Sequence, residues 1–567
     1  MAKLQEYNGL FCESEFECAF IAFLQDEGWE YLLGNNVKRV NKRDVLIEDD
    51  FKEFIARTNP DLEEDEITQI FDNVRLVGSE SDFATLHKIY TWMVDGIQFT
   101  PKNGITRIIP LIDFEYLDDK EKTKPSKNIF RVVNQLTIEY TDNGQNKNRR
   151  PDVILYVNGM PLCIIELKNP ADPNATIFDA WEQINIRYWR DIPHLLHYCP
   201  LACISDGVKT RLGTVKTPYE HFYAWRRVNH DDKISTLPFA ETQTMIKGVY
   251  EPNRFLEIFR DYIYFQDSIY DKDEKEIVCR YPQFFAARLL KESIVNSVET
   301  GSGKGGTYFG ATGCGKTYTM AFLARQLALR CTNIPQIGSP TIILIVDREE
   351  LQKQGAKLFT KSKEFLNLGE VSIVKSREKL RQELGARQSG GFYICTIQKF
   401  CDRKDDKIGL INERQNIICF SDEAHRTQIE HAKEIKFSKD TDENMKALIS
   451  KPYAKVLKEA FPNATFVGFT GTPIAETYQT FGDEIDRYTM DQAVADGLTV
   501  PIKYHPRIAK VLLDQSKVKE IEDYYKKCAD DGATEEDIAA SKSAMSSCRK
   551  CSFRFKNACR LRSSKEN

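Results

Sequence analysis

The residues with the clearest chemical meaning lie in the segment Gly310–Thr317, which reads GATGCGKT. A glycine, four further residues and then Gly-Lys-Thr form the pattern of a phosphate-binding loop. Its glycines let the backbone turn so that N–H groups point inward and hold phosphate oxygens. Lys316 is expected to reach the β- and γ-phosphates, and the Thr317 hydroxyl to ligate Mg²⁺. The predicted nucleotide-binding residues of the loop are Gly310, Thr312, Gly313, Cys314, Gly315, Lys316 and Thr317.

A glycine-rich turn that matches this pattern by accident is the alternative. The segment that follows, TYTMAFLARQLALR, carries apolar residues at helical spacing and therefore predicts a helix. A helix N-terminus favours a bound anion, so this context favours the phosphate-binding reading.

The segment Arg149–Pro170, RRPDVILYVNGMPLCIIELKNP, predicts a β-hairpin. Residues Asp152–Val157 are rich in β-branched and aromatic side chains, and Pro161–Leu167 predicts the returning strand. Between them, Asn158-Gly159 is a strong signal for a two-residue turn. We expect this hairpin to lie at a sheet edge.

Three side chains of this hairpin suit phosphodiester hydrolysis. Glu166 and Lys168 are two residues apart and project from one face, and antiparallel pairing brings Asp152 beside them. The two carboxylates would hold Mg²⁺, which polarises the phosphate and acidifies a water. The lysine would orient that water or offset charge in the transition state. A surface hairpin with a salt bridge is the alternative, and the apolar strands favour the nuclease.

Two predicted helical segments of the first 270 residues carry further polar residues. In Glu13–Tyr31, Glu13 and Glu17 lie one turn apart, and an exposed acidic stripe is about as probable as a role in a site.

The second segment is Ile177–Leu196, in which Gln183 and Arg187 lie one turn apart with Tyr188 beside them. These residues could contact DNA or support the metal site. Packing of Tyr188 and its apolar neighbours into the core is the alternative.

Residues 277–500 alternate strand-like and helix-like segments, which predicts a parallel sheet. Polar residues follow several apolar strands, at the carboxyl ends where such sheets bind ligands. These strand segments are Ser339–Leu351, Gly390–Phe400, Asn416–Arg426 and Ala464–Pro473.

Residues at the ends of the last two of these segments have predicted roles in nucleotide chemistry. Asp422 is placed to hold Mg²⁺, and Glu423 to orient and deprotonate the attacking water, whereas a helix N-cap with an acidic first turn is the alternative. Thr470 and Thr472 suit sensing of the γ-phosphate. Upstream of the phosphate loop, Gln283 could place its amide against adenine.

The whole chain limits the function classes. It has 567 residues, 41% hydrophobic and 29% charged, and no apolar run long enough to cross a bilayer. Its 15 cysteines and the lack of a secretory signal predict a reduced, cytoplasmic setting. The net charge of −5 requires that any DNA-binding surface be local. Cys548 and Cys551 have zinc-like spacing, but Cys559 gives no fourth ligand, so no zinc site is predicted.

Together the motifs resemble a known family. The phosphate loop, DEAH and FTGTP resemble the first RecA-like lobe of superfamily 2 helicases and translocases. With the upstream RPD…ELKNP segment, the chain resembles the R subunit of type I restriction enzymes, which moves DNA and cuts it. Further segments resemble the family in order: ISDG, RYPQFFAAR, DREEL, TIQKF, SDEAHRTQ and DRYTMDQAVADGLTVPIKYHPR.

The resemblance implies roles, cofactors and partners. Asp152, Glu166 and Lys168 would form the nuclease triad, and ATP and Mg²⁺ would be the cofactors. The ATPase residues would be Lys316, Thr317, Asp422 and Glu423, with Gln283 on the base and Thr470 and Thr472 coupling ATP state to DNA. Double-stranded DNA and the methyltransferase and specificity subunits would be the partners. The family's Gln-x-x-x-Tyr pattern is altered here, since Gln183 and Tyr188 have four residues between them.

The predicted fold is α/β with two main domains. Residues 1–270 would form a PD-(D/E)xK nuclease domain, 271–500 a RecA-like first motor lobe, and 501–567 a partly disordered tail that begins an incomplete second lobe. Asp271–Glu276 is the candidate linker. A truncated fragment that binds ATP and DNA without translocating is one alternative, and a type III restriction subunit is another.

Overall fold

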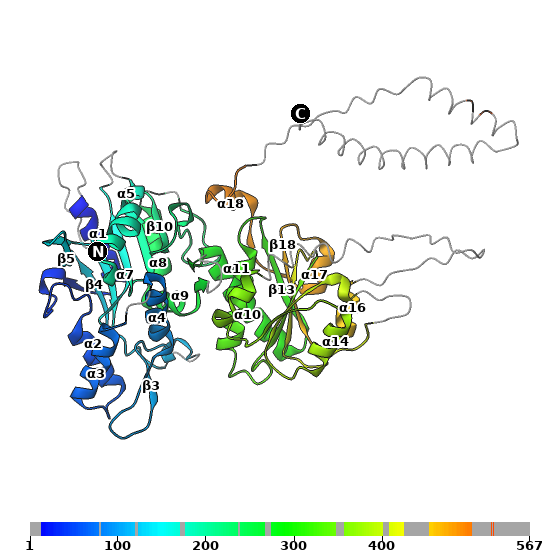
Figure 1. Cartoon of the computed structure of the whole chain (residues 1–567). Coiled ribbons are helices and arrows are strands. Elements are labelled where there is room, and N and C mark those ends of the chain that lie inside the picture. The colour runs from blue at the N-terminus through cyan, green and yellow to red at the C-terminus, as the bar shows by residue number, and fades with distance from the viewer. Residues whose placement is uncertain are drawn as a thin grey trace. The chain divides into compact units, whose positions relative to one another are not determined.

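The computed structural model describes residues 13–78, 81–119, 123–169, 176–235, 237, 239–266, 274–347, 357–400, 408–424, 453–501, 523 and 526. Contacts divide the chain into a compact unit, Met1–Val500, and a second unit, Pro501–Asn567. The helices and strands given below all lie in the first unit (Figure 1).

The N-terminal part is built on a mixed six-stranded sheet with the order β1-β4-β7-β8-β9-β10. The predicted hairpin is confirmed as β7 and β8, which pair antiparallel through a turn at Asn158-Gly159 with positive φ at both residues. Its predicted place at a sheet edge is wrong, because β4 and β9 flank it. Both hairpin strands are buried along their whole length, which only a central position allows. The strands are β1 (Glu30–Leu33), β4 (Phe130–Asn134), β7 (Val153–Val157), β8 (Met160–Leu167), β9 (Leu201–Ser205) and β10 (Thr210–Thr214).

Helices and three two-stranded ribbons surround this sheet. The ribbons are β2 (Ile97–Phe99) with β3 (Arg107–Ile109), β5 (Ile138–Asp142) with β6 (Gln145–Arg149), and β11 (Ile263–Gln266) with β12 (Lys275–Val278). The helices are α1 (Glu13–Asp26), α2 (Glu48–Thr58), α3 (Glu64–Arg75), α4 (Asp82–Asp95), α5 (Ile177–Glu182), α6 (Trp189–Asp191), α7 (Pro193–Leu196), α8 (Ala240–Val249) and α9 (Pro252–Asp261).

The expected linker is partly ordered as a strand. Lys275 and Glu276 belong to β12, where Glu276 pairs with Phe265 of β11 and is buried, while residues 271–273 lie outside the described residues. The linker prediction is therefore wrong for its last residues. The charged composition of these residues does not predict a strand, and one forms because β12 pairs with β11, which lies earlier in the chain.

A second sheet has seven strands in the order β15-β16-β14-β17-β18-β13-β19, and every pairing is parallel, as predicted. The strands are β13 (Lys304–Gly310), β14 (Thr341–Val346), β15 (Val371–Ile373), β16 (Phe392–Thr396), β17 (Ile417–Asp422), β18 (Thr465–Thr470) and β19 (Glu484–Tyr488). The helices are α10 (Tyr281–Thr300), α11 (Lys316–Arg330), α13 (Lys363–Leu366), α14 (Arg377–Ala386), α16 (Tyr453–Ala460), α17 (Ala475–Phe481) and α18 (Met490–Ala495).

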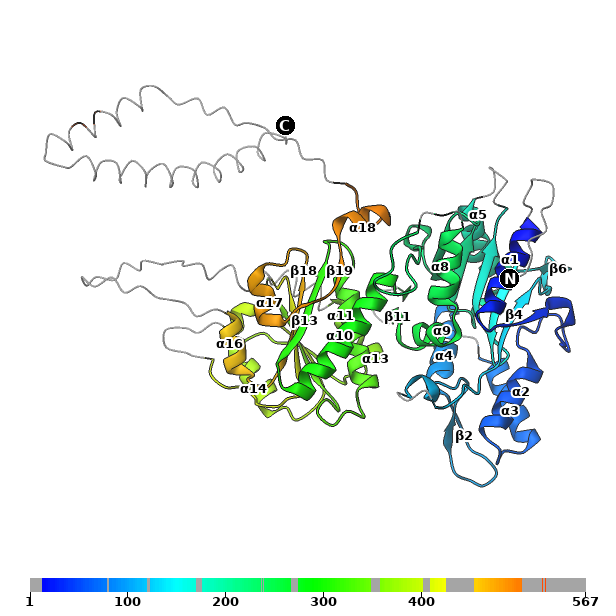
Figure 2. The ribbon, with the colours of Figure 1, turned by 180° about the vertical axis from the view of Figure 1, so that it is seen from behind.

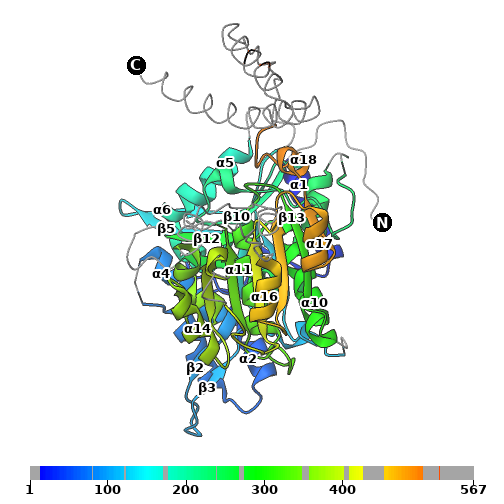
Figure 3. The same ribbon diagram turned by 90° about the vertical axis from the view of Figure 1, so that its right-hand side faces the viewer.

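Helices cover both faces of this sheet. Figures 1 and 2 show α10 and α11 on one side and α14, α16 and α17 on the other, and Figure 3 views the sheet from the side of α14 and α16. Alternate residues of β14 pack to opposite sides: Ile342 joins the apolar cluster that contains α10 and α11, and Ile343 joins the cluster that contains α14 and α16. Burial on both faces explains why these strands are continuous apolar runs.

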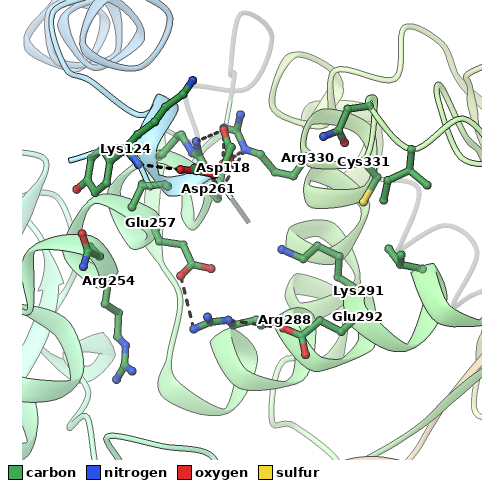
Figure 4. Close-up of a pocket in the computed structure, with 18 of the residues that line it drawn as sticks. Asp118, Lys124, Arg254, Glu257, Asp261, Arg288, Lys291, Glu292, Arg330 and Cys331 are labelled. Atoms are coloured by element: carbon green, nitrogen blue, oxygen red, sulfur yellow. Dashed lines mark hydrogen bonds and ion pairs between the residues drawn. The ribbon is translucent and has the colours of Figure 1, made fainter. Parts of the chain in front are cut away.

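Buried ion pairs join α9 to α11. Asp261, at the end of α9, is 2% exposed and accepts hydrogen bonds from Arg330 at the end of α11 and from Arg260. The shortest of these contacts joins Arg330 Nη2 to Asp261 Oδ1 across 2.6 Å, and Figure 4 shows it beside a cavity of about 1020 Å³. Because α11 begins at Lys316 of the phosphate loop, this contact ties the nucleotide-binding segment to the N-terminal part.

Candidate active sites

The three predicted nuclease residues lie together where β7 begins and β8 ends. Asp152 directly precedes β7, and its Oδ2 accepts a hydrogen bond from the Leu167 N–H across 2.8 Å. Glu166, near the end of β8, is fully buried. Lys168 follows β8, with its N–H bonded to the Ser205 carbonyl across 2.8 Å. The pairing of β7 with β8 therefore places two carboxylates and an ammonium group at one point of the sheet.

The surroundings of Glu166 strongly alter the pKa of its carboxyl. Burial raises the pKa of its carboxyl well above the ordinary value, and the charge of Asp152 raises it further, while Lys168 lowers it. One oxygen, Oε1, accepts a hydrogen bond from the Tyr188 hydroxyl across 2.7 Å. The other, Oε2, is buried and has no hydrogen-bond donor among the described residues.

This arrangement fits a divalent cation. A buried carboxylate oxygen without a donor, beside a second carboxylate, is the environment that an oxygen-liganded metal stabilises. No set of three His, Cys, Asp or Glu side chains within the described ranges could hold a metal ion. Asp152 and Glu166 would therefore share the ion with backbone carbonyls or waters.

A π-helix brings Gln183 and Tyr188 to the same site. Lys168 Nζ donates to Gln183 Oε1 across 3.1 Å, and Gln183 Nε2 donates to the Tyr188 hydroxyl across 2.7 Å. Residues Gln183–Tyr188 form one π-helical segment between α5 and α6. A π-helix bonds residue i to i+5, so the additional residue between Gln183 and Tyr188 leaves both side chains on one face.

A polar cavity of about 940 Å³ opens beside Asp152. Glu17 of α1 lies in its wall, 8% exposed, and accepts hydrogen bonds from Asn134 Nδ2 at 2.7 Å and Gln135 Nε2 at 2.8 Å. The acidic-stripe alternative is thus wrong for Glu17, whereas the side chain of Glu13 lies outside the described residues. Nothing in the sequence pointed to Asn134 and Gln135, because only the pairing of β4 with β7 brings them here. The other lining residues are Ser14, Cys18, Asn148, Arg149, Arg150, Asp152, Gln183, Arg187 and Tyr188.

The phosphate loop has the backbone that its sequence predicts. Gly313 and Gly315 have φ values of 82° and 83°, which other residues rarely adopt, and α11 begins at Lys316. Lys316 Nζ donates to the Gly310 carbonyl across 3.3 Å and lies 3.7 Å from Glu423 Oε1. The ammonium group therefore lies between the loop and the carboxylate that follows β17.

Gln283, which lies on α10, makes a hydrogen bond to the backbone of the phosphate loop. Its Oε1 accepts from the Arg280 N–H across 2.9 Å, and its Nε2 donates to the Gly315 carbonyl across 3.3 Å. Arg280, whose side chain was given no predicted role, donates through Nη2 to the Cys314 carbonyl. In this structure the Gln283 amide is 3% exposed and orders the loop, so a contact with adenine would require it to exchange these partners.

Asp422 and Glu423 lie at the carboxyl end of β17, as expected. Burial raises the pKa of Asp422 to about 6, with the charge of Glu423 adding and Lys316 opposing. The Glu423 N–H donates to Asp422 Oδ1 across 3.0 Å, and Glu423 has a φ of 48°, a strained value for a residue with a side chain. Backbone strain of this kind is found at sites where geometry is functional.

The Thr470–Thr472 segment lies against the phosphate loop. A Cβ on Gly471 would lie 3.3 Å from the Gly310 carbonyl oxygen and 3.4 Å from Thr312 Oγ1. The Thr472 N–H donates to Thr470 Oγ1 across 3.1 Å, and Thr470 is fully buried. The segment is thus near enough to respond to the loop, with Thr472 the more exposed of its two hydroxyl residues.

The remaining predictions concern membranes and zinc. No helix in the described portion is long and apolar enough to cross a bilayer. The cysteines considered for zinc, Cys548, Cys551 and Cys559, lie outside the described residues.

Comparisons with known proteins identify a family model for each of two parts of the chain. Residues 12–221 match the family model for the type I restriction enzyme R protein N terminus, and residues 282–537 match the model for the SWI2/SNF2 ATPase. The first range contains Asp152, Glu166 and Lys168, and the second contains the phosphate loop with Asp422 and Glu423.

Individual relatives extend over both ranges. The chain is 31% identical to the type I restriction enzyme HindI endonuclease subunit of Haemophilus influenzae over 87% of this chain and 46% of that protein. It is 29% identical to a protein described as the MjaIXP endonuclease subunit of Methanocaldococcus jannaschii, over 92% of this chain and 49% of that one. A solved fragment described as an R subunit from Vibrio vulnificus matches 67% of this chain and 58% of its own, at 16% identity and a TM-score of 0.24.

The chain spans about half the length of the curated relatives that it matches, 46% and 49% of them. Across that span it carries the family's N-terminal region followed by an ATPase region, in the order that the motifs predicted. The chain belongs to the family of type I restriction enzyme R subunits, the endonuclease subunits of these enzymes.

Proposed function

We propose that this chain cleaves double-stranded DNA and couples ATP to movement along it, together with the methyltransferase and specificity subunits of a type I system. The observation that carries the proposal is the cluster of Asp152, Glu166 and Lys168, held by Gln183 and Tyr188. Mg²⁺ and ATP would be the cofactors, held by the carboxylates of each site and by the phosphate loop.

In the nuclease site, the two carboxylates and the lysine would have different roles because their charges are opposite. Asp152 and Glu166 supply the negative oxygens for Mg²⁺, and Tyr188 orients Glu166 through its 2.7 Å hydrogen bond. Mg²⁺ bound there would polarise the scissile phosphate. Lys168, oriented by Gln183, would position the attacking water and offset charge that develops on the phosphate.

In the ATPase site, Lys316 would leave Glu423 for the β- and γ-phosphates. The present ion pair, 3.7 Å between Nζ and Oε1, holds both groups beside the phosphate loop. Glu423 would then accept a proton from the attacking water, while Thr317 and Asp422 hold Mg²⁺.

The test uses the full chain with its partner subunits on unmodified duplex DNA. Asp152→Ala and Lys168→Ala are each expected to abolish cleavage while nucleotide binding stays at the wild-type level. A matched control is Asp72→Ala, which removes an exposed carboxylate of α3 in the same domain that pairs with Arg75. Undiminished cutting by either site variant would rule out this nuclease centre.

A further inference from the structure

The β5–β6 hairpin is separate from the sheet that carries the nuclease residues. Asp142 pairs with Gln145, so only Asn143 and Gly144 form the turn, with φ values of 50° and 78°. Positive φ at both positions is typical of a type I′ turn, whose twist matches that of the strands it joins. The hairpin is therefore a short ribbon with a tight tip, at the margin of the N-terminal part (Figures 1 and 2).

Little of this hairpin is buried. Along β6, Gln145, Asn146, Lys147 and Asn148 are exposed, and none of them is apolar. A two-stranded ribbon is marginally stable in water by itself, so a polar ribbon adds little to the folding free energy. The side chains of β6 are therefore not explained by core packing.

The base of the hairpin, in contrast, is firmly held. Arg149 Nε donates to Asp191 Oδ2 across 2.7 Å, and the guanidinium carbon lies 5.6 Å from the centre of the Tyr140 ring. Ile138, at the start of β5, is fully buried. Anchoring the base while leaving the tip in solvent gives a projecting arm of defined direction.

This arm continues directly into the nuclease site. Only Arg150 and Pro151 separate β6 from Asp152, and Asn148, Arg149 and Arg150 line the cavity beside Asp152. Arg187 also lines this cavity, with its side chain 51% exposed. The rim of the cavity thus carries amide and guanidinium N–H donors next to the Asp152 carboxylate.

Each carboxylate of the hairpin is paired with a lysine, so neither leaves an unpaired negative charge that would repel an anionic ligand. Asp142 Oδ2 lies 2.6 Å from Lys147 Nζ, and Glu139 Oε1 lies 3.6 Å from Lys42 Nζ. With each acid paired, the outward groups of the hairpin are amides, and the Arg150 guanidinium follows directly after β6. Such donors suit phosphate oxygens and the acceptor-rich edges of base pairs.

We propose that the β5–β6 hairpin is a duplex-DNA-binding arm that sets the phosphodiester against Asp152, Glu166 and Lys168. A two-stranded ribbon fits the major groove, and the basic side chains at its base would contact the adjoining phosphates. The proposal rests on the proposed nuclease function for its orientation, but the binding it describes needs neither metal nor cleavage.

The experiment measures binding of the full chain to a labelled duplex of about 30 base pairs by fluorescence anisotropy without Mg²⁺, over a series of salt concentrations. The test variant combines Asn146→Ala, Lys147→Ala and Asn148→Ala, which leaves the turn and the Arg149 anchor in place. The matched control is Lys102→Ala, since Lys102 is also an exposed lysine paired with carboxylates, 57% exposed against 47% for Lys147.

The triple variant is expected to bind about tenfold more weakly, with a salt dependence reduced by about one counterion, while the control binds as wild type. Photo-cross-linking of wild type to an iodouracil-substituted duplex should label the peptide that contains β6. Wild-type affinity and salt dependence in the triple variant, or cross-links confined to other peptides, would contradict the proposal that this hairpin binds DNA.

The two proposals fail separately. If Asp152→Ala still cleaves DNA while the triple variant binds poorly, the nuclease assignment is wrong and the arm stands. If Asp152→Ala is inactive while the triple variant binds normally, the nuclease assignment stands and the arm is wrong. Equal melting temperatures for wild type and the triple variant exclude misfolding as the cause of weak binding.

Discussion

Gln183 Nε2 lies 2.7 Å from the Tyr188 hydroxyl, although the two residues are five positions apart on one helix. Their contact depends on the π-helical segment, because an α-helix would rotate residues at this separation onto different faces. Through it, a single chain of hydrogen bonds runs from Lys168 to Gln183, Tyr188 and Glu166. The altered spacing of this motif is thus compensated by the local helix geometry.

Tyr188→Phe should lower DNA cleavage by about tenfold or more while ATP hydrolysis is unchanged. The substitution leaves Glu166 without its hydrogen-bond donor and frees its orientation, a cost of about 1–3 kcal/mol. The measurement is the cleavage rate as a function of Mg²⁺ concentration. Tyr198→Phe is the control, since Tyr198 is also buried and donates to a backbone carbonyl, that of Val74. Equal losses in both variants would indicate a general packing effect.

Lys316→Ala and Glu423→Gln should separate nucleotide binding from turnover. Lys316→Ala is expected to weaken ATP binding, because it removes the ammonium group from the phosphate loop. Glu423→Gln should keep binding within a few-fold and slow hydrolysis by about a hundredfold or more, because an amide cannot accept the proton of water. Titration with a fluorescent ATP analogue and steady-state hydrolysis give the two quantities. The same loss of binding in both variants would contradict the assignment.

Mg²⁺-dependent nucleotide binding should weaken as the pH falls through about 6. Burial raises the pKa of Asp422 to about 6, so its carboxyl takes up a proton below that pH and can no longer hold a cation. Binding measured with and without Mg²⁺ from about pH 5 to 8 checks this. In Asp422→Asn the Mg²⁺-dependent part should be small at every pH. A midpoint that persists in this variant would point to another group.

Arg330→Ala should reduce the free energy of unfolding by about 3 kcal/mol, because it removes a partner from the buried carboxylate of Asp261. The control is Arg288→Ala, which lines the same cavity but is half exposed and lies 3.7 Å from Glu257 (Figure 4). Loss of that pair should cost about 1 kcal/mol or less. Denaturant unfolding of both variants measures the difference, and comparable values would show that the Asp261 contact contributes little.

Local patterns in the sequence were sufficient to predict the main elements of the chain and the residue types at its two candidate sites. Glycine spacing in Gly310–Thr317, the Asn158-Gly159 turn and the apolar strands before Asp422 are local patterns. They predict a phosphate loop, a hairpin and a parallel sheet because side-chain periodicity and turn chemistry act over a few residues. The pairing of Asp152 with Glu166 follows from the same hairpin.

Contacts between residues far apart in the chain could not be predicted from such local patterns. The pairing of β4 with β7 and of β8 with β9 placed the hairpin in the centre of its sheet, and the packing of α1 on β4 brought Asn134 to Glu17. Packing of α10 on the phosphate loop engaged Gln283 with Gly315. Such contacts form between strands and helices separated by tens of residues, so their register is set by burial of the whole sheet, and no local pattern encodes it.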